Sequence, residues 1–233
     1  MSIAAVVFDL GSTLVRETGF YPEEARGFLL SRVAAPHNVR EEELKDFDER
    51  VLRDMLERRE RSGLELQLTQ YFNLLEACFG VTLQGDSDEL AYGCWSREYK
   101  PRLEDGAMEC LSQVRGSGVK IGLLSNTILS RKTVRLAMKD FGILDFFDAV
   151  VCSSEVGYRK PNGPIYRAIL SLLQTKAEQS AMVGDNLEND IAGAASVGMN
   201  TVWYNPGQLP ALKIKPDHIA SDLPSVPGVL GLR

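Results

Sequence analysis

The sequence is poor in the residues from which several common active sites are built. Among its 233 residues, histidine occurs only at His37 and His218, so a His-rich metal cage cannot be built. A Ser-His-Asp triad would need one of these two unpromising candidates. The cysteines are spaced too widely for a zinc knuckle or a Cys-x-x-Cys redox pair, and we expect reduced thiols in the core. They are Cys78, Cys94, Cys110 and Cys152.

Long apolar runs and an excess of basic residues are also missing. No stretch approaches the roughly 18 consecutive apolar residues of a membrane span, and the first residues contain neither a basic region nor a cleavable apolar segment. The net charge of −6 argues against a nucleic-acid surface, because binding to a phosphate backbone depends on clustered Lys and Arg. We therefore expect a cytoplasmic protein that binds neither membranes nor nucleic acid, and the sequence indicates no particular protein partner.

The acidic charge is concentrated between Glu17 and Lys100. This segment has 11 basic and 18 acidic residues, a net charge of −7, whereas the rest of the chain has 15 basic and 14 acidic residues. Its apolar residues recur near spacings of three and four, which is typical of amphipathic helices, and no strand-like run interrupts them. We expect an all-helical insert over residues 17–100, with helices over residues 24–35, 41–61, 64–79 and 86–99.

Residues 1–16 and 101–233 show a different pattern, in which short apolar runs alternate with helical segments. Repeated βα units of this kind predict an α/β fold with a Rossmann-like, doubly wound parallel sheet and helices on both faces. We expect the tail, residues 221–233, to form an edge or to wrap the surface. The expected strands cover residues 3–8, 119–124, 149–152, 181–183, 200–204 and 217–219, and the expected helices cover residues 107–115, 131–140, 164–173 and 190–197.

Polar residues follow several of these apolar runs. Asp9, Ser125 and Asp185 each come at or just after the end of a run of strand length, and such residues meet at the carboxyl edge of a parallel sheet. Lys160 leads into a helical segment, and Asp190 lies five residues after Asp185, a spacing that resembles a hard-cation site. Each motif alone is weak, since an acid beside a glycine is more often a turn residue. Together they are the parts needed to move a phosphoryl group.

The order of these motifs resembles that of the haloacid dehalogenase superfamily of hydrolases, in the subgroup whose helical cap is inserted directly after the first strand. The resemblance covers essentially the whole chain. Its four motifs are Phe8–Leu14, Ser125-Asn126, Lys160 within residues 154–161, and Gly184-Asp185 with Asp190.

The resemblance implies a role for each of these residues. Asp9 would attack phosphorus and form an aspartyl phosphate, Ser125 and Asn126 would bind the phosphoryl group, and Lys160 would neutralise its charge. A Mg²⁺ ion would be held by Asp9, the backbone carbonyl of Gly11 and Asp185, with Asp190 as an additional or more distant acid. A cation is also physically reasonable there, because a carboxylate and a phosphate dianion repel each other.

One position departs from the family pattern. The first motif usually carries a second Asp two residues after the nucleophile, as general acid for the leaving group and base for water, and Gly11 stands there instead. The carbonyl of Gly11 can still bind a metal, but the proton shuttle is gone. Glu17 and Tyr21, at the entrance to the insert, are minor candidates to replace it. The departure puts the rate and the range of leaving groups in doubt.

Three functions fit these observations. The first is a Mg²⁺-dependent phosphatase that hydrolyses a small phosphorylated metabolite, with the insert closing over it. The second is a metal-independent 2-haloacid dehalogenase. In that case Asp185 and Asp190 would lie beside Asp9 with no cation to compensate their charges, which is electrostatically costly. The third is a catalytically weak regulatory or binding protein on the same scaffold. Periodicity does not say which side chain of the insert faces the nucleophile, the candidates being Arg59, Arg61, Tyr71 and Arg97.

Overall fold

A six-stranded parallel sheet forms the centre of the computed structural model, which describes residues 2–210 and 213–232. The strand order is β5-β4-β1-β6-β7-β8, so β1 lies between β4 and β6. The expected α/β fold class is confirmed, and most strands lie within one or two residues of the predicted ranges. Their bounds are β1 Ala5–Phe8, β4 Lys120–Ser125, β5 Ala149–Cys152, β6 Ser180–Gly184, β7 Asn200–Tyr204 and β8 His218–Ala220.

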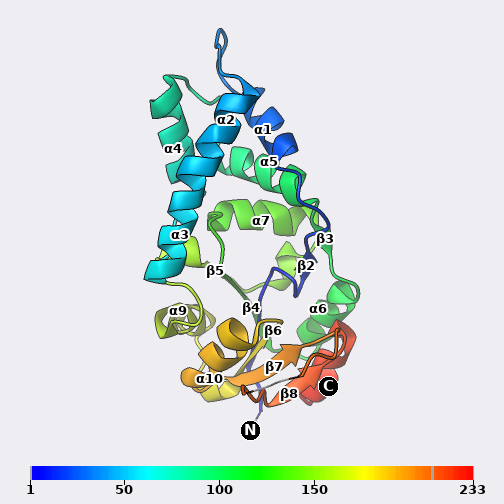
Figure 1. The fold of residues 1–233 in the computed structure, drawn as a ribbon. Helices are drawn as coiled ribbons and strands as arrows, with labels where there is room; N and C mark the ends of the chain where they lie inside the picture. The colour runs from blue at the N-terminus through cyan, green and yellow to red at the C-terminus, as the bar shows by residue number, and fades with distance from the viewer. Residues whose placement is uncertain (1, 211–212, 233) are drawn as a thin grey trace.

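Both faces of this sheet are covered. Side chains of successive residues in a strand point to opposite faces, and in β1 Val6 and Phe8 join one apolar cluster whereas Ala5 and Val7 join the other. Helices pack on each side, as Figure 1 shows around the lower part of the molecule. None of the helices in the described part of the chain is long and apolar enough to cross a membrane. The core helices are α6 Ala107–Gly116, α7 Arg131–Asp140, α8 Ser153–Val156, α9 Gly163–Leu173, α10 Gly193–Ser196 and α11 Val226–Val229.

The strand register brings the predicted polar residues to one edge. Phe8 of β1 is level with Leu123 of β4 and with Val183 of β6. Asp9 follows directly after this level, and Ser125 and Asp185 each lie two residues beyond it. Parallel strands therefore deliver the three side chains to the same carboxyl edge.

The segment between the first strand and α6 is helical, as expected. The insert is entered and left through two short strands, β2 Val15–Arg16 and β3 Arg102–Leu103, which pair antiparallel, so the two crossings run side by side. Its helices lie at the end of the molecule beyond the carboxyl edge of the sheet, at the top of Figure 1. They are α1 Pro22–Leu30, α2 Glu41–Phe47, the π-helical turn η1 Asp48–Leu52, α3 Arg53–Ser62, α4 Leu68–Phe79 and α5 Ser87–Tyr99.

Four predicted helices have different bounds in the structure, and the first of them, expected over residues 24–35, runs from Pro22 to Leu30. The helix expected over 41–61 contains the π-helical turn η1, so its two α-helical parts are offset in phase. The helix expected from residue 64 begins only at Leu68, because Leu64 bridges to Tyr158 of the core and the Glu65 amide donates to Gly157. The helix expected from Asp190 begins earlier, at Leu187, as a second π-helical turn.

The tail and one cysteine also differ from expectation. Leu223 and Val226 are completely buried, so the tail contributes to the core and does not merely wrap its surface. Cys110 and Cys152 are buried as expected, but Cys78 is exposed and is not a core thiol. The first and last residues of the predicted core, Met1 and Arg233, lie outside the described residues.

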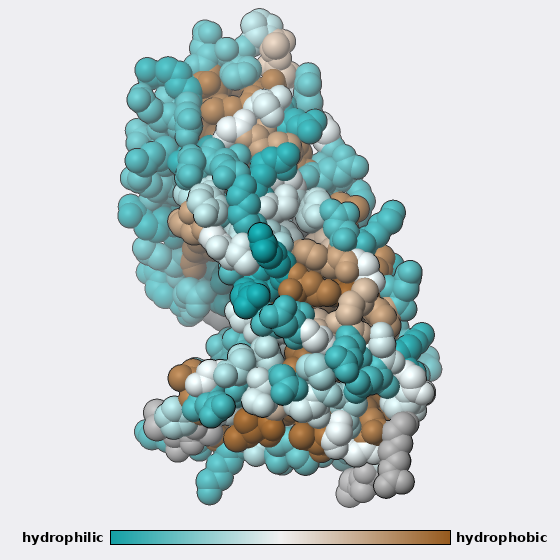
Figure 2. Space-filling view, turned by 90° about the vertical axis from the view of Figure 1, so that its right-hand side faces the viewer, coloured by the Kyte–Doolittle hydropathy of each residue, from teal (hydrophilic) through white to brown (hydrophobic). Residues whose placement is uncertain are grey.

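The insert contacts the core on two sides. On one side α5 packs against α7, with Lys132 paired to Asp86 at 2.8 Å and a hydrogen bond from the Tyr92 hydroxyl to Asp140. On the other side, residues 64–68 lie against the segment that leads to Lys160. The outer face of the insert visible in Figure 2 is covered mainly by hydrophilic side chains.

Candidate active site

Asp9 is placed by the backbone at the end of β1. Its amide donates to the Val183 carbonyl at 2.9 Å, which continues the pairing of β1 with β6 by one residue. The side chain is almost completely buried, with 7% exposure of the residue. A carboxylate in such surroundings needs partners, because burying an isolated charge is costly.

Lys160 supplies one of these partners. Its Nζ lies 2.6 Å from Oδ1 of Asp9 and 2.6 Å from Oδ1 of Asp190. Both backbone groups of Lys160 bind the side chain of Asn126, whose Oδ1 accepts from the Lys160 amide at 2.8 Å and whose Nδ2 donates to its carbonyl at 3.0 Å. The strand end of β4 therefore fixes the backbone from which the lysine reaches Asp9.

Asp190 reaches the site from the π-helical turn η4 Leu187–Ala192. Its second oxygen accepts from the Asn186 amide at 3.0 Å. Gly184 makes room for this carboxylate, because a Cβ on Gly184 would lie 2.3 Å from the Asp190 side chain. A glycine at the end of β6 is therefore a packing requirement of the site.

Asp185 is held by two elements. Thr13 Oγ1 lies 3.3 Å from Asp185 Oδ1 and accepts from the Asp185 amide at 3.2 Å, and the Trp203 indole donates to the Asp185 carbonyl at 2.8 Å. The sequence interpretation did not single out Thr13 or Trp203. Thr13 belongs to the same motif as Asp9, and this could have indicated that it lies near the site. Nothing in the sequence links Trp203 to Asp185.

We call Asp9, Lys160, Asp185 and Asp190 together the acidic site. If all four side chains are ionised, they carry a net charge of −2. Burial raises the pKa of Asp9 to about 7, opposed by Lys160 and reinforced by Asp190. Burial and then repulsion from Asp190 raise the pKa of Asp185. Burial lowers the pKa of Lys160, but the two carboxylates outweigh it and raise it above its ordinary value, so the lysine is charged.

The geometry of the three carboxylates fits a divalent cation. One oxygen each from Asp9, Asp185 and Asp190 can be chosen so that all three lie within 4.8 Å of one another. The single ammonium of Lys160 leaves the cluster with excess negative charge, and oxygen ligands of this kind suit Mg²⁺. The residues present therefore fit the metal that the motif resemblance implied.

Ser125 and Gly11 complete the carboxyl edge. Ser125 is 5% exposed, and its hydroxyl takes part in none of the hydrogen bonds found among the described residues. Gly11 is exposed, its φ is outside the left-handed region, and a Cβ built on it meets no atom within 4 Å. A side chain at position 11 would fit without strain.

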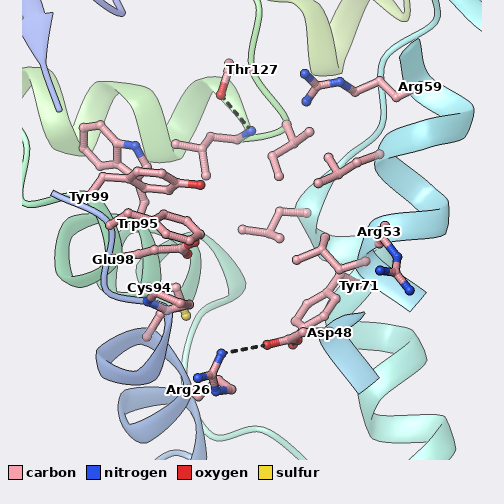
Figure 3. A pocket seen from close by; sticks show the side chains of 18 of the residues that line it. Arg26, Asp48, Arg53, Arg59, Tyr71, Cys94, Trp95, Glu98, Tyr99 and Thr127 are labelled. Atoms are coloured by element: carbon pink, nitrogen blue, oxygen red, sulfur yellow. Dashed lines mark hydrogen bonds and ion pairs between the residues drawn. The ribbon is translucent and has the colours of Figure 1, made fainter. Parts of the chain in front are cut away.

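A second feature lies above the acidic site. A cavity of about 1040 Å³ is lined by helices of the insert and by residues 127–129 of the core (Figure 3). Of the insert side chains singled out in the sequence, Arg59, Arg61 and Tyr71 line this cavity, whereas Arg97 stacks on Phe28 at 4.1 Å from the ring centroid. We call it the insert cavity.

The sequence matches the family model of haloacid dehalogenase-like hydrolases over residues 3–198. The chain belongs to this family. The motif order, the parallel sheet and the acidic site therefore agree with one another on family membership, and the chain is a hydrolase by family.

Individual relatives span nearly the whole chain. A ribulose-1,5-bisphosphate 5-phosphatase of Halopiger xanaduensis is 30% identical over 213 residues, which is 88% of this chain and 85% of the relative. A glyceraldehyde 3-phosphate phosphatase of Methanothermobacter thermautotrophicus is 28% identical, over 87% and 86% of the two chains. The crystal structure of a HAD phosphatase from Thermococcus onnurineus superposes with a TM-score of 0.69 at 25% identity, covering 100% of this chain and 99% of the other.

Proposed function

We propose that the protein is a Mg²⁺-dependent phosphatase that hydrolyses a small phosphorylated metabolite through an aspartyl phosphate on Asp9. The observation that carries this proposal is the buried contact of Asp9 with Lys160 beside two further acids. The relatives named as phosphatases support the same reaction class.

Each side chain has a distinct role in this reaction. Asp9 attacks phosphorus, and Lys160 favours the ionised form of Asp9 against the effect of burial and compensates the charge of the transferred oxygens. Ser125 Oγ, which is free of partners in the part of the chain that is described, donates to a phosphoryl oxygen. Because both ends of the Asn126 amide are engaged with Lys160, we assign Asn126 to positioning the lysine rather than to binding phosphate itself.

Asp9, Asp185 and the carbonyl of Gly11 would hold Mg²⁺, with Asp190 as an additional acid. The ion supplies the positive charge that lets an anionic nucleophile approach an anionic phosphate. Thr13 orients Asp185 through its hydroxyl. The other anchor of Asp185 is the Trp203 indole.

We further propose that residues 1–16 and 101–233 form the hydrolase core, that residues 17–100 form a cap, and that the protein works in the cytoplasm. The paired strands β2 and β3 support the domain division, because all chain crossings between the two parts run through them. The dehalogenase alternative has less support, since three clustered acids would then remain without a cation.

The test is phosphate release from an aryl phosphate ester by wild type and by Asp9→Asn. We expect the variant to lose activity by at least about a thousandfold, because the nucleophile is removed with little change in volume. EDTA should silence the wild type and Mg²⁺ restore it. The matched control is Asp145→Asn, at an exposed position of the core, which should behave as wild type. Undiminished activity of Asp9→Asn would rule out the aspartyl phosphate.

A further inference from the structure

One residue of the acidic site is carried by a helical turn with irregular winding. Asp190 lies in the π-helical turn η4, and both of its carboxylate oxygens are used. One oxygen lies 2.6 Å from Nζ of Lys160, and the other accepts from the Asn186 amide at 3.0 Å. Because these contacts fix the orientation of Asp190, the interaction that keeps the turn in its π-helical form matters to the site.

The π-helical form leaves one backbone carbonyl without its α-helical partner. In an α-helix the Asn189 carbonyl would accept from the Gly193 amide, four residues later. That amide donates to the Glu188 carbonyl instead, and the Ile191 amide reaches back in the same way to Asn186 at 3.3 Å. The Asn189 carbonyl can therefore accept from a donor outside the turn.

Tyr166 supplies this donor from α9, which lies against α10 (Figure 1). Tyr166 is completely buried, and its hydroxyl donates to the Asn189 carbonyl. Burial, followed by the negative charges of Asp190 and Asp9, raises the pKa of Tyr166, so the hydroxyl keeps its proton for this bond. The bond joins the helix that follows the Lys160 loop to the turn that carries Asp190.

Gly193 leaves the space that this bond needs. A Cβ on Gly193 would overlap the Tyr166 hydroxyl and would lie 2.9 Å from Cα of Pro161, which is closer than real Cβ atoms come. Pro161 is the residue after Lys160. The Lys160 loop, the ring of Tyr166 and the turn that carries Asp190 therefore meet at one point, with no room for a side chain between them.

Loss of the hydroxyl would favour the α-helical form of the turn. In the π-helical form the Asn189 carbonyl would lose its donor, whereas in the α-helical form the Gly193 amide would satisfy it. The two forms differ by about one residue of winding, and each residue of an α-helix turns by about 100°. Since α10 is held by its packing on α9 and β7, this change would turn Asp190 away from Lys160.

We propose that Tyr166 is a positioning residue of the acidic site, whose hydroxyl holds η4 in its π-helical form and thereby aims Asp190 at Lys160. Tyr166 acts through the backbone of Asn189 and takes no part in the reaction itself. Its effect on the winding of η4 is a property of the fold alone. The consequence for Mg²⁺ rests on the proposed function.

The first test reads the winding of η4 in protein without Mg²⁺. NMR coupling through the hydrogen bond identifies the carbonyl that accepts from the Gly193 amide. We expect this carbonyl to be that of Glu188 in wild type. In Tyr166→Phe, which keeps the ring and its packing, we expect the Glu188 coupling to be lost and a coupling to Asn189 to replace it.

Tyr204→Phe is the matched control for this measurement. Tyr204 is also a buried tyrosine of the core, and its hydroxyl donates to Glu104 at 3.4 Å and not to η4. It should keep the wild-type coupling. The proposal is overturned if Tyr166→Phe retains the full Glu188 coupling, or if the control loses this coupling to the same extent.

The second test reads the consequence for Asp190 by calorimetric titration of Mg²⁺ without substrate. Changing a group that orients a metal ligand typically weakens metal binding about 10- to 100-fold. We expect about tenfold for Tyr166→Phe, because Asp190 is only an additional acid in the proposed Mg²⁺ site. In an Asp190→Asn background the same change should have no further effect, since no carboxylate is left to aim.

Two results of this titration would contradict a positioning role. An unchanged Mg²⁺ affinity in Tyr166→Phe would mean that the hydroxyl does not control Asp190. A tenfold loss that persists in the Asp190→Asn background would mean that Tyr166 affects packing in general and does not act through Asp190.

The two tests together separate this inference from the phosphatase function. If wild type binds no Mg²⁺ but Tyr166→Phe loses the Glu188 coupling, the Mg²⁺-dependent reaction fails and the control of η4 by Tyr166 stands. If wild type binds Mg²⁺ and releases phosphate, but Tyr166→Phe changes neither the coupling nor the affinity, the inference is wrong while the phosphatase function stands.

Discussion

The acidic site and the insert cavity are neighbours with opposite construction. In the acidic site every charged side chain has a partner within hydrogen-bond distance, and Lys160 contacts two acids at 2.6 Å each. In the insert cavity, charged side chains such as Arg53 and Glu98 line the wall together with apolar ones such as Leu56, and the Nε of Arg26 has no hydrogen bond within the described part of the chain. We infer from this difference that the side chains at the sheet edge carry out the reaction and that the insert contacts the rest of the substrate.

The two regions also differ in what holds them in place. The acidic site is fixed by strand register and by backbone hydrogen bonds, which leave little freedom. The cavity depends on how the insert sits on the core, through α5 against α7 and through residues 64–68. Substitutions in the acidic site should therefore reduce stability or activity strongly. Substitutions in the insert should instead change substrate preference or the docking of the insert on the core.

The largest effect should come from Lys160→Met. It leaves Asp9 and Asp190 buried side by side without their shared cation, and breaking a buried ion pair in this way costs about 3 to 5 kcal/mol of unfolding free energy. Mg²⁺ should recover part of the loss, because it compensates the same carboxylates. Urea unfolding in EDTA and in Mg²⁺ measures both quantities.

Lys139→Met is the control for this experiment, because Lys139 is exposed on α7. Its effect should stay within about 0.5 kcal/mol. Should Lys160→Met be no less stable than this control in EDTA, the lysine is not the counter-charge of the two acids.

Glu65→Gln should have the next largest effect, on docking of the insert. The Glu65 side chain is fully buried between Arg59 and Arg159, each at 3.5 Å, and accepts from Ser153 Oγ at 2.6 Å. Removing its charge leaves the exposed Glu60 as the one acid of the described chain that contacts both arginines, at a cost of about 2 to 3 kcal/mol. Amide exchange of residues 64–68 should therefore become roughly 30- to 150-fold faster.

The control for the docking prediction is Glu57→Gln, at an exposed position on α3. Its exchange in the same segment should match that of wild type. Identical exchange in Glu65→Gln and wild type would mean that the other contacts of residues 64–68, to Gly157, Ile128 and Ser154, are enough to hold this segment to the core.

These residues show what the sequence could and could not predict. Asp9, Ser125 and Asp185 were predicted to meet because parallel strands have one carboxyl edge, whatever the rest of the chain does. Glu65 was predicted to lie inside a helix, because its apolar neighbours have helical spacing. Its partners Ser153 and Gly157 lie about 90 positions away in the sequence, and the spacing of neighbouring residues contains no information about such distant contacts.

The insert cavity was unpredictable for a related reason. The spacing of apolar residues shows that a helix has an apolar face, but it does not show whether that face meets another helix or an open space. Leu56 and Leu75 both fit the helical pattern, yet Leu56 lines the cavity and Leu75 is 1% exposed within the packed cluster. The side chains of the insert that line the cavity can therefore be identified only from the structure, whereas the type of reaction could be inferred from the order of the motifs.

Gly11→Asp should have a more moderate effect on the reaction. A missing general acid penalises poor leaving groups most, and proton donation is worth roughly 10² to 10⁴ in rate where an alkoxide departs. We expect wild type to prefer aryl over alkyl phosphates and Gly11→Asp to narrow this ratio by about tenfold. The side chain fits, because nothing lies within 4 Å of its Cβ position and the φ of Gly11 is not left-handed.

The ratio of kcat/KM for phenyl phosphate and glycerol phosphate, in both proteins, measures this effect. Gly11→Asn is the matched control, since it has the same size and no carboxyl group. An unchanged ratio in a folded Gly11→Asp protein would mean that another residue already supplies the acid, and Glu17 on the cavity wall would be examined next.

The smallest effect, a change in stability, should come from Glu98→Gln in the insert cavity. It tests whether an acid in the cavity that lacks an ion-pair partner among the described residues behaves differently from the paired acids of the acidic site. Burial raises the pKa of Glu98, the Tyr99 hydroxyl opposes the rise, and the other charged groups facing it are Asp48, Arg26 and Glu17. Because the pKa of Glu98 is raised in the folded protein, there is a pH range in which the Glu98 side chain is protonated in the folded state but ionised in the unfolded state. Stability should therefore be highest below the ordinary Glu pKa and should fall as the pH rises through the raised one.

Glu98→Gln removes this titration. Its melting temperature should match that of wild type at pH 4 and exceed it slightly at pH 8, with the difference growing between these values and then levelling off. Glu23→Gln, at an exposed position in α1, supplies the baseline for a change from Glu to Gln in the insert. A gain in Glu98→Gln that does not vary with pH relative to this baseline would show that the cavity does not penalise a charge at position 98.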